Sequence, residues 1–462
     1  MSVGAERKLG ERIARELYRD PDYIDDPVLV EYVQGIWQPL LAAARSRGDL
    51  NAELDERFAW QVLLGKDRSI NAFALPGGWL GLHLGLVSVT TTRDELASVL
   101  AHELSHVTQR HISRMVTQEA RQAPWMVAAM ILGALAVSKN PEAGKAVIMG
   151  GQALGIQQQL NFSRDMEREA DRIGLGVMTQ AGFQAQGFVT MFEKLQQAAR
   201  LNDNGAYPYL RSHPMSTERA ADMQSRQQLQ ASTPAVTTLE HAIAAGRARV
   251  ISNPGVDALR GLLLEADASI LSSQPRARQA GALYAGTLAA SRLRDAAASA
   301  RLLARLNAVV ASDPVAQRLA RLLEAEIALA AGDRARVLQL LDASATGRPD
   351  MLLVTQAQLQ SGKAEAAAQR LQTWVATQPR DATAWQQLAS AYQAQGQALR
   401  AVRAEAESRM AQLDYTAALD RFKAAQDIVR RGGSGGDHIE ASIIDTRARQ
   451  VESLVREQAL ER

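Results

Sequence analysis

Apolar residues recur at helical spacing along much of the chain. Residues 8–48 carry two such stretches, separated by the turn-rich DPDYIDDP, and two more cover residues 163–181 and 186–200. Residues three and four apart lie on one face of an α-helix, so each stretch predicts a helix that buries one side. We expect the first two helices to pack on the helix predicted for residues 94–118, which is described below.

Two other stretches predict strands. These are residues 56–63 and residues 70–89, and Pro76-Gly77-Gly78 divides the second into a hairpin. The proline confines that part to an edge or a turn, and an edge strand can bind a peptide as one more strand. His83 alternates with apolar residues, and we expect it to pack within the strand.

Residues 94–118 are predicted to form one helix. Thr92 and Glu95 make a T-x-x-E capping box before it, and an apolar row follows at helical spacing: Leu96, Val99, Leu100 and Val107. His111 comes five residues after His106, so it should point away from that residue. We interpret His111 as a surface or helix-end histidine.

Within this helix, His102, Glu103 and His106 form an H-E-x-x-H pattern. Residues four apart share a helix face, so the two imidazoles can converge on one ion, and Zn²⁺ prefers such nitrogen ligands. The glutamate then lies beside the water that the ion activates and can transfer its proton to a leaving amine. The pattern predicts a zinc peptidase.

A third protein ligand is expected outside this helix. Glu167 and Asp171 are four apart on the helix predicted for residues 163–181, so they can face the same way. Glu167 is the candidate ligand, and Asp171 is the candidate to orient a zinc histidine through its other ring nitrogen. Glu169 lies off that face and is expected in solvent. E-x-x-x-D alone is common on charged helices.

Residues 119–160 are apolar and rich in glycine. They predict either core helices or a flap over the site, or else a surface, at residues 125–155, that makes peripheral contact with a membrane or with unfolded substrate. The longest apolar run, Trp125–Val137, is 13 residues long. That length is too short to cross a bilayer.

Composition limits the classes of partner, metal ligand and cellular location that we expect. The net charge of +2 gives no reason to expect a nucleic-acid partner, and the absence of cysteine leaves only histidine and carboxylate as metal ligands. Met1–Arg7 has no apolar signal core, so we expect either a cytoplasmic protein or a signal peptide that has been removed. His241 and His438 lie outside any cluster and receive no role.

The second half of the chain predicts a helical repeat. A linker-like stretch at 230–238 precedes Ala/Leu/Arg-rich helices, with repeating positions at Gly332, Gly362 and Gly396 and at Pro314, Pro349 and Pro379. Trp385, Leu388 and Tyr392 fit the start of a tetratricopeptide unit. We expect four or five units, a flexible break at 430–438 and a capping helix over 438–460. An ordinary helical bundle is the alternative.

Three motifs in order carry a family resemblance. HELSH at 102–106, EREAD at 167–171 and HPMSTER at 213–219, with INAFALPGG upstream, resemble the zinc metallopeptidases related to CAAX prenyl endopeptidases. The similarity covers about residues 5–230 and is greatest to their soluble, tetratricopeptide-containing bacterial branch. It implies a periplasmic location and, as partners, outer-membrane β-barrel proteins and their assembly complex. Unlike the membrane-spanning relatives, this chain has no predicted transmembrane helix, which argues against a prenylated substrate.

The resemblance also implies a role for each motif residue. It implies one zinc ion per chain bound by His102, His106 and Glu167, Glu103 as general base, Asp171 as the residue that orients a ligand, and His213 and Arg219 near the oxyanion. His213 allows a second hypothesis: it lies in a loop and can itself occupy the fourth zinc position at rest, which would silence the enzyme.

The predicted fold is mostly α. An α+β zincin-like metallopeptidase domain with a small β-sheet (residues 1–230) precedes an α-helical tetratricopeptide solenoid (residues 239–462). The predicted function is a zinc endopeptidase with a docking domain, active in quality control and assembly of outer-membrane β-barrel proteins and able to act as a chaperone. The alternatives are a chaperone or adaptor that rarely or never cleaves, and a cytoplasmic peptidase.

Overall fold

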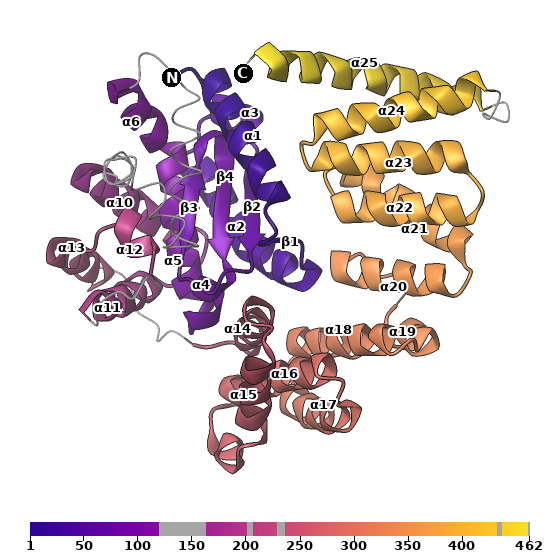
Figure 1. Cartoon of the computed structure of the whole chain (residues 1–462). Helices are drawn as coiled ribbons and strands as arrows, with labels where there is room; N and C mark the ends of the chain where they lie inside the picture. Colours follow the sequence, from indigo (N-terminus) through magenta and orange to yellow (C-terminus); the bar gives the residue numbers. More distant parts are fainter. Residues whose placement is uncertain (120–162, 201–206, 229–235, 343, 432–436, 461–462) are drawn as a thin grey trace, which may run out of the picture. The chain divides into compact units, whose positions relative to one another are not determined.

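The computed structural model describes residues 1–119, 163–200, 207–228, 236–342, 344–431 and 437–460 (Figure 1). The segment predicted to touch a membrane or a substrate, 125–155, lies outside the described residues. So do most of the predicted linker at 230–238 and most of the predicted break at 430–438.

The chain divides into two compact units, Met1–Ala320 and Arg321–Arg462. Neither limit falls at the predicted linker. The domain limits 1–230 and 239–462 stay a prediction. α14, the first helix after the linker, packs into the core of the first unit, so this unit extends past the predicted limit. Its residues Ala244 and Ala248 belong to the same buried cluster as the residues around the H-E-x-x-H helix.

The first unit opens with helices around a small sheet. Its elements up to residue 228 are α1 (Val3–Arg19), β1 (Tyr23–Ile24), α2 (Pro27–Arg47), α3 (Ala52–Arg57), β2 (Gln61–Gly65), β3 (Ala72–Leu75), η1 (Pro76–Gly78), β4 (Trp79–His83), α4 (Leu84–Val89), α5 (Arg93–Thr108), α6 (His111–Glu119), α10 (Arg164–Gln180), α11 (Gln186–Arg200), α12 (Tyr209–Ser212) and α13 (Thr217–Gln228). The strand order is β1-β2-β4-β3, with β2 and β4 parallel and the other two pairs antiparallel.

The predicted hairpin is confirmed, and β3 is the edge strand on its side of the sheet. Its turn needs both glycines, since Gly77 and Gly78 have φ of 74° and 83°, a region that side chains with a Cβ rarely occupy. α1 packs directly on this turn: a Cβ at Gly10 would lie 1.9 Å from the carbonyl oxygen of Pro76. α1 therefore holds the hairpin in place beside α5.

Three secondary-structure predictions are wrong in part. Of residues 56–63, the first two end helix α3, and the strand is displaced to Gln61–Gly65. Residues 84–89 form helix α4 rather than the end of a strand. The helix predicted over 94–118 is interrupted after Thr108, because Arg110 adopts a left-handed conformation with φ of 54° and α6 begins anew at His111.

α5 is the centre of the first unit. Every residue from Glu95 to Thr108 is buried, because α2, α10, α11 and the hairpin surround this helix. His83, at the end of β4, is buried as predicted and contacts the Ser69 hydroxyl through Nδ1 at 2.8 Å. A helix enclosed on all sides is a rigid support for the polar side chains that it carries.

The first unit continues with α14 (Leu239–Ser252), α15 (Val256–Asp267), η2 (Ser269–Ser273), α16 (Arg276–Arg292) and α17 (Ala296–Val310). The limit between the units falls within α18 (Pro314–Ala330). The second unit continues with α19 (Arg334–Leu340), α20 (Arg348–Gln360), α21 (Ala364–Thr377), α22 (Ala382–Ala394), α23 (Ala398–Ala411), α24 (Tyr415–Arg430) and α25 (His438–Leu460). Gly332, Gly362 and Gly396, the repeating glycines of the sequence, all have φ between 71° and 79°. Each follows a helix closely, where a left-handed residue ends the turn.

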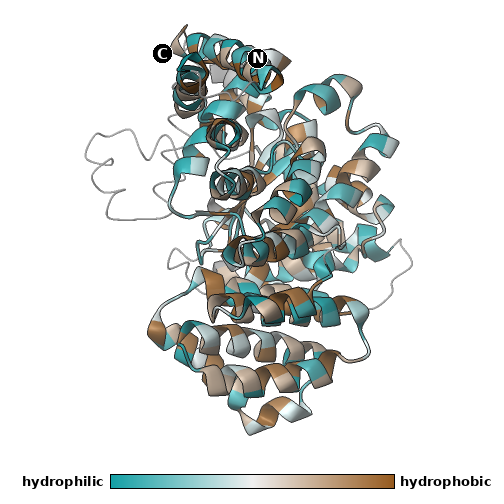
Figure 2. Cartoon of the chain, turned by 90° about the vertical axis from the view of Figure 1, so that its right-hand side faces the viewer, coloured by the Kyte–Doolittle hydropathy of each residue, from teal (hydrophilic) through white to brown (hydrophobic). Residues whose placement is uncertain are grey.

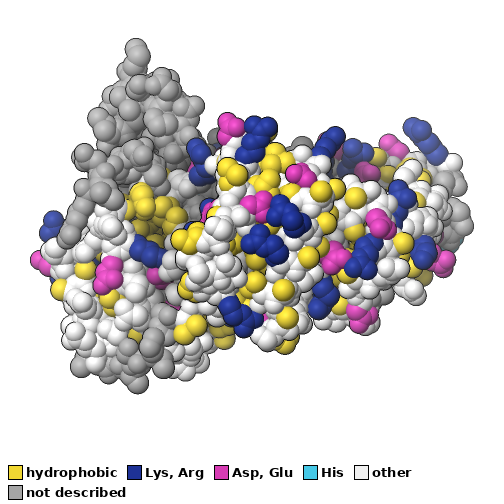
Figure 3. All heavy atoms as spheres, turned by 90° about the horizontal axis from the view of Figure 1, so that it is seen from below, with side chains coloured by type: hydrophobic (Ala, Val, Ile, Leu, Met, Phe, Trp, Pro, Cys, Tyr) yellow, Lys and Arg dark blue, Asp and Glu magenta, His cyan; other side chains and the backbone are white. Residues whose placement is uncertain are grey.

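Hydrophilic and hydrophobic residues alternate along the helices (Figure 2), and on the face in Figure 3 basic and acidic side chains are interspersed. Among the described residues, no helix is both long and apolar enough to span a membrane.

Candidate metal centre

The H-E-x-x-H motif lies in the middle of α5. The Thr92 side chain accepts a hydrogen bond from the Glu95 amide at 3.2 Å, and Glu95 accepts one from the Thr91 amide at 2.7 Å. These contacts fix the start of the helix two turns before the motif. His102 and His106 are buried and share one helix face, as their spacing predicted.

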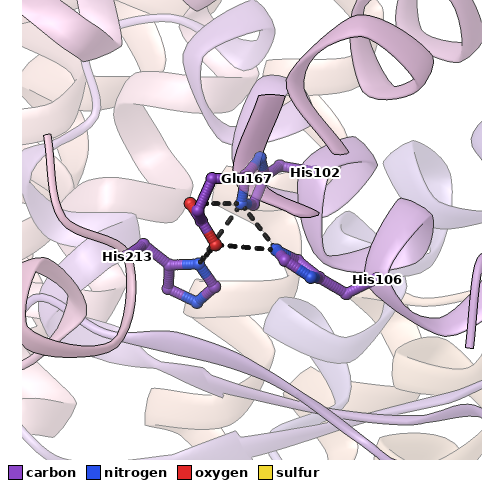
Figure 4. A group of neighbouring side chains, drawn as sticks. All are labelled: His102, His106, Glu167 and His213. Carbon is purple, nitrogen blue, oxygen red and sulfur yellow. Dashed lines mark hydrogen bonds and ion pairs between the residues drawn. The ribbon is translucent and has the colours of Figure 1, made fainter. Parts of the chain in front are cut away.

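Four side chains from two helices and a loop converge on one point (Figure 4). Ligand atoms of His102, His106, Glu167 and His213 all lie within 4.8 Å of one another. Nε2 of His102 lies 2.9 Å from Nε2 of His106, and Nδ1 of His213 lies 3.0 Å from Oε1 of Glu167. Glu167 comes from the first turn of α10, and His213 directly follows α12. The structure thus places His213 among the potential ligands.

The outer nitrogens of the two α5 histidines also have neighbours. Nδ1 of His102 lies 2.9 Å from Oδ1 of Asp171, the residue predicted to orient a ligand. Nδ1 of His106 lies 2.8 Å from Nδ1 of His111. The prediction of a surface location for His111 is therefore wrong: its side chain is fully buried, because the break at Arg110 turns it back toward His106.

Glu103 lies on the same helix with its carboxylate inside the protein. It is completely buried, and neither carboxylate oxygen has a hydrogen-bond partner among the described residues. Its Oε1 lies 3.4 Å from Nε2 of His213. Burial raises the pKa of Glu103, and the positive forms of His213 and His102 oppose that shift. A buried carboxylate without a hydrogen-bond partner is costly, which indicates a site where water or substrate binds.

Arg219 is engaged behind the ligands. Its Nε and Nη2 donate to the two oxygens of Asp171 at 2.7 and 2.8 Å, and its Nη1 lies 2.8 Å from Oε2 of Glu167. Nη1 also donates to the carbonyl of Pro214, next to His213, at 2.8 Å. Burial raises the pKa of Asp171, but Arg219 and His102 together outweigh burial, and the net pKa of that carboxyl is lowered.

The charges of this cluster leave an imbalance. Glu103, Glu167 and Asp171 bring three buried carboxylates, and Arg219 brings one buried guanidinium. With the histidines neutral, two negative charges remain without compensation, and buried charge of this kind is expensive. Without a cation, protons fill the deficit: burial lowers the pKa of His102, but Glu167 and Asp171 raise it to about 10.

This donor set fits a divalent metal ion. Three imidazoles and a carboxylate are ligands that zinc accepts, and two positive charges balance the cluster. Three ligands and one open position suit catalysis, whereas four protein ligands suit a closed site. The arrangement can therefore support metal-assisted hydrolysis when His213 lies away from the ion, and a resting state when it is bound.

Sequence reasoning missed part of the surroundings. Glu169, expected in solvent, is partly buried and lies 3.0 Å from Nε2 of His111 and 2.8 Å from Nη1 of Arg114. Tyr209 stacks on His213 with ring centroids 4.5 Å apart. The sequence shows that His111 closely follows the motif, but it does not show that Arg110 is left-handed and turns His111 toward the site, because arginine rarely adopts that conformation.

Comparison with known proteins places this site in a family domain. Residues 41–227 match the family model of Peptidase family M48, and the site residues all lie within this range. The putative beta-barrel assembly-enhancing protease of Vibrio cholerae is 35% identical over 259 residues, 56% of this chain and 51% of that protein. The beta-barrel assembly-enhancing protease of Escherichia coli K12 is 32% identical over 281 residues, 61% of this chain and 56% of that protein.

A mitochondrial relative matches a shorter part. The mitochondrial metalloendopeptidase OMA1 of Schizosaccharomyces pombe is 32% identical over 160 residues, 35% of this chain and 44% of that protein. The chain spans about half the length of the two bacterial relatives.

Proposed function

From the premise that residues 41–227 are a metallopeptidase domain of Peptidase family M48, we propose that this chain is a zinc-dependent endopeptidase. The observation that carries the proposal is the convergence of His102, His106 and Glu167 beside Glu103, a buried carboxylate without a hydrogen-bond partner. These three residues would hold one zinc ion, and Asp171 would fix the ring of His102.

A zinc ion held there would polarise the scissile carbonyl and lower the pKa of water. Glu103 takes the proton from the attacking water and delivers it to the leaving amine. Its raised pKa suits both steps, because a carboxyl that titrates closer to neutrality can accept a proton and return it.

Substrate would bind along the edge strand β3. This strand packs beside α5, and no other described strand pairs with its outer edge. A peptide in extended form can add to that edge through main-chain hydrogen bonds, which holds a peptide bond over the metal without a demand on its sequence.

We assign His213 to the resting state. Its Nδ1 lies 3.3 Å from Nε2 of His102 and 3.0 Å from Oε1 of Glu167, as expected of a fourth ligand. The rival assignment, with His213 and Arg219 as donors to the oxyanion, requires a free guanidinium. Arg219 instead faces Asp171 and Glu167, which favours a positioning role for it.

The cellular role follows from the bacterial relatives. They are named for enhancement of β-barrel assembly, so we propose a periplasmic protease that acts on outer-membrane β-barrel proteins and contacts their assembly complex. The helical hairpins after residue 239 would serve as a tetratricopeptide docking surface. A closed four-ligand site also favours a second function, a chaperone that holds clients and rarely cleaves them.

The test is casein degradation by the wild type, Glu103→Gln and His213→Ala, with the zinc content of each. Glu103→Gln should keep one zinc and lose at least about a hundredfold in rate, the effect of removing a general base. His213→Ala should cleave faster than the wild type. Slower cleavage by His213→Ala would support the oxyanion assignment. Absence of zinc from the wild type would refute the peptidase proposal.

A further inference from the structure

His111 lies against the back of the metal centre. Its side chain is fully buried, with Nδ1 2.8 Å from Nδ1 of His106 and Nε2 3.0 Å from Oε2 of Glu169. The same oxygen of Glu169 accepts a hydrogen bond from Nη1 of Arg114 at 2.8 Å. These contacts form a row from His106 to the protein surface, because Glu169 and Arg114 are both partly exposed.

If His106 binds a metal ion, the hydrogen bonds of this row can run in only one direction, from His106 through His111 to Glu169. Nε2 of His106 faces Glu167 and His102, so a metal there requires the lone pair on Nε2 and the proton on Nδ1. Nδ1 of His111 must then accept this proton's hydrogen bond, which leaves the His111 proton on Nε2. That nitrogen faces the carboxylate of Glu169, the acceptor it needs.

We infer that His111 is a positioning residue for the metal, which fixes the ring and tautomer of His106 and transmits to it the negative charge of Glu169. The inference rests on the proposed function. It gives the two α5 ligands different support: His102 meets the carboxylate of Asp171 directly, whereas His106 reaches a carboxylate through a second imidazole. A hydrogen bond to the outer nitrogen of a ligating histidine raises its basicity and holds its orientation.

The backbone is shaped to place this residue. In an unbroken helix, five residues correspond to about 500°, so His111 would point roughly 140° away from His106. The left-handed conformation of Arg110 interrupts the helix and brings the imidazole back. Nε of Arg110 donates to the buried carboxylate of Glu6 at 2.8 Å, and Nη2 donates to the carbonyl of Met1 at 2.7 Å. The start of α1 thus stabilises an unfavourable backbone conformation.

The experiment measures zinc binding by the full chain through competition with a chromogenic chelator. His111→Leu keeps the volume but removes the acceptor, and His111→Gln retains both an acceptor and a donor. His111→Leu should raise the zinc dissociation constant by about 10- to 100-fold, the usual effect of removing such a partner. His111→Gln should recover most of that loss, and Glu169→Gln should lie between. His438→Leu, at an exposed histidine, is the matched control.

A spectroscopic readout separates positioning from packing. In the cobalt-substituted protein, His111→Leu should shift the visible absorption bands, whereas His111→Gln should resemble the wild type. Zinc binding by a folded His111→Leu as tight as in the wild type would overturn the inference, and so would an equal loss in His111→Gln. Should His111→Leu not fold, His111→Gln and Glu169→Gln decide. If the wild type binds no zinc, the proposed function itself fails, whereas a His111→Leu variant with the zinc affinity and the activity of the wild type refutes only the role of His111.

Discussion

Asp171 serves two partners at once. One oxygen lies 2.9 Å from Nδ1 of His102, and both oxygens accept hydrogen bonds from Arg219. Arg219 and His102 lower the pKa of this carboxyl, and an ionised carboxylate would hold the proton of His102 on Nδ1, the nitrogen that faces away from the candidate metal position. The charge of one residue thereby determines which nitrogen another residue presents.

Asp171→Asn should therefore weaken zinc binding by about 10- to 100-fold, because the amide cannot accept from both partners as a charged group does. The zinc dissociation constant and casein cleavage are the measurements. Asp165→Asn is the control, since that carboxylate lies on the same helix and is almost fully exposed. Equal affinities in the two variants would show that Asp171 does not orient His102.

His241 is another buried histidine with fixed contacts. Its Nε2 donates to the carbonyl of Thr90 at 2.8 Å, so in the neutral ring Nδ1 accepts from the Tyr32 hydroxyl at 2.6 Å. Burial lowers the pKa of His241, and nearby Lys194 acts in the same direction. The folded protein therefore resists protonation of this ring.

The consequence is a loss of stability in acid. Above the unfolded pKa of about 6.5 both states are neutral and His241 has no effect. Below it the unfolded chain binds a proton that the folded chain refuses, so stability falls by up to about 1.4 kcal/mol per pH unit, until the lowered pKa is reached. Urea unfolding of zinc-saturated protein between pH 7.5 and 5 should show a steeper decline for the wild type than for His241→Gln. Parallel curves would refute this assignment.

At the candidate metal centre, sequence spacing was enough to predict which side chains of one helix lie on the same face. The positions of His102 and His106, and of Glu167 and Asp171, follow from four-residue intervals. The same rule failed for His111, because it assumes that the helix continues. Where the helix breaks, Arg110 donates a hydrogen bond to Glu6, more than a hundred residues earlier, and such a contact has no local signal in the sequence.

Among the elements, turns were easier to predict than the segments after them. Pro76-Gly77-Gly78 specifies a hairpin, since two consecutive glycines with positive φ can form the turn. Residues 84–89 are apolar at both helical and strand periods, so periodicity could not separate α4 from a strand. In the structure, α4 packs against α14, which lies about 150 residues later in the chain. The sequence of residues 84–89 alone carries no sign of this contact.

Two glycine substitutions in α1 test whether its packing on the hairpin turn stabilises the first unit. Gly10→Ala would bring a Cβ to within 1.9 Å of the Pro76 carbonyl oxygen, so α1 or the turn must move. We expect a loss of about 1–3 kcal/mol, typical of overpacking, together with slower cleavage. Gly4→Ala in the same helix meets nothing within 4 Å and should stabilise by about 0.5–1 kcal/mol. Urea unfolding of both variants checks this, and a neutral Gly10→Ala would contradict it.

On the scale of the whole molecule, the linker-like composition at 230–238 did not reveal which core α14 joins. Composition reports on the local chain, whereas α14 is held in the first unit by residues far away in sequence. Arg247 of α14 donates to both oxygens of Asp26, the residue that caps α2, and to the hydroxyl of Tyr284 on α16. The first helices after the linker are thus tied to the first helices of the chain.

Arg247→Met should destabilise the first unit by about 3–5 kcal/mol, because it removes the bidentate ion pair of Asp26, whose carboxylate is only 12% exposed. Arg260→Met, at an arginine of α15 that is two-thirds exposed, should change stability by less than about 0.5 kcal/mol. Thermal unfolding followed by circular dichroism distinguishes the two. Equal midpoints for both variants would mean that the ion pair does not hold α14 in place.

The separation of the metal-site residues along the chain has a consequence for folding. His102 meets His213 across 111 residues, and Glu167 meets His213 across 46. Contacts of this kind form only after long loops have closed, whose entropic cost local interactions cannot offset. Arg219, which braces Asp171 and Glu167, is the last of these residues in chain order. Early in folding, only His102 and His106 are already held together, because they share one helix. We therefore expect the full set of candidate ligands to assemble late, and a metal ion to be captured only when the unit is nearly folded.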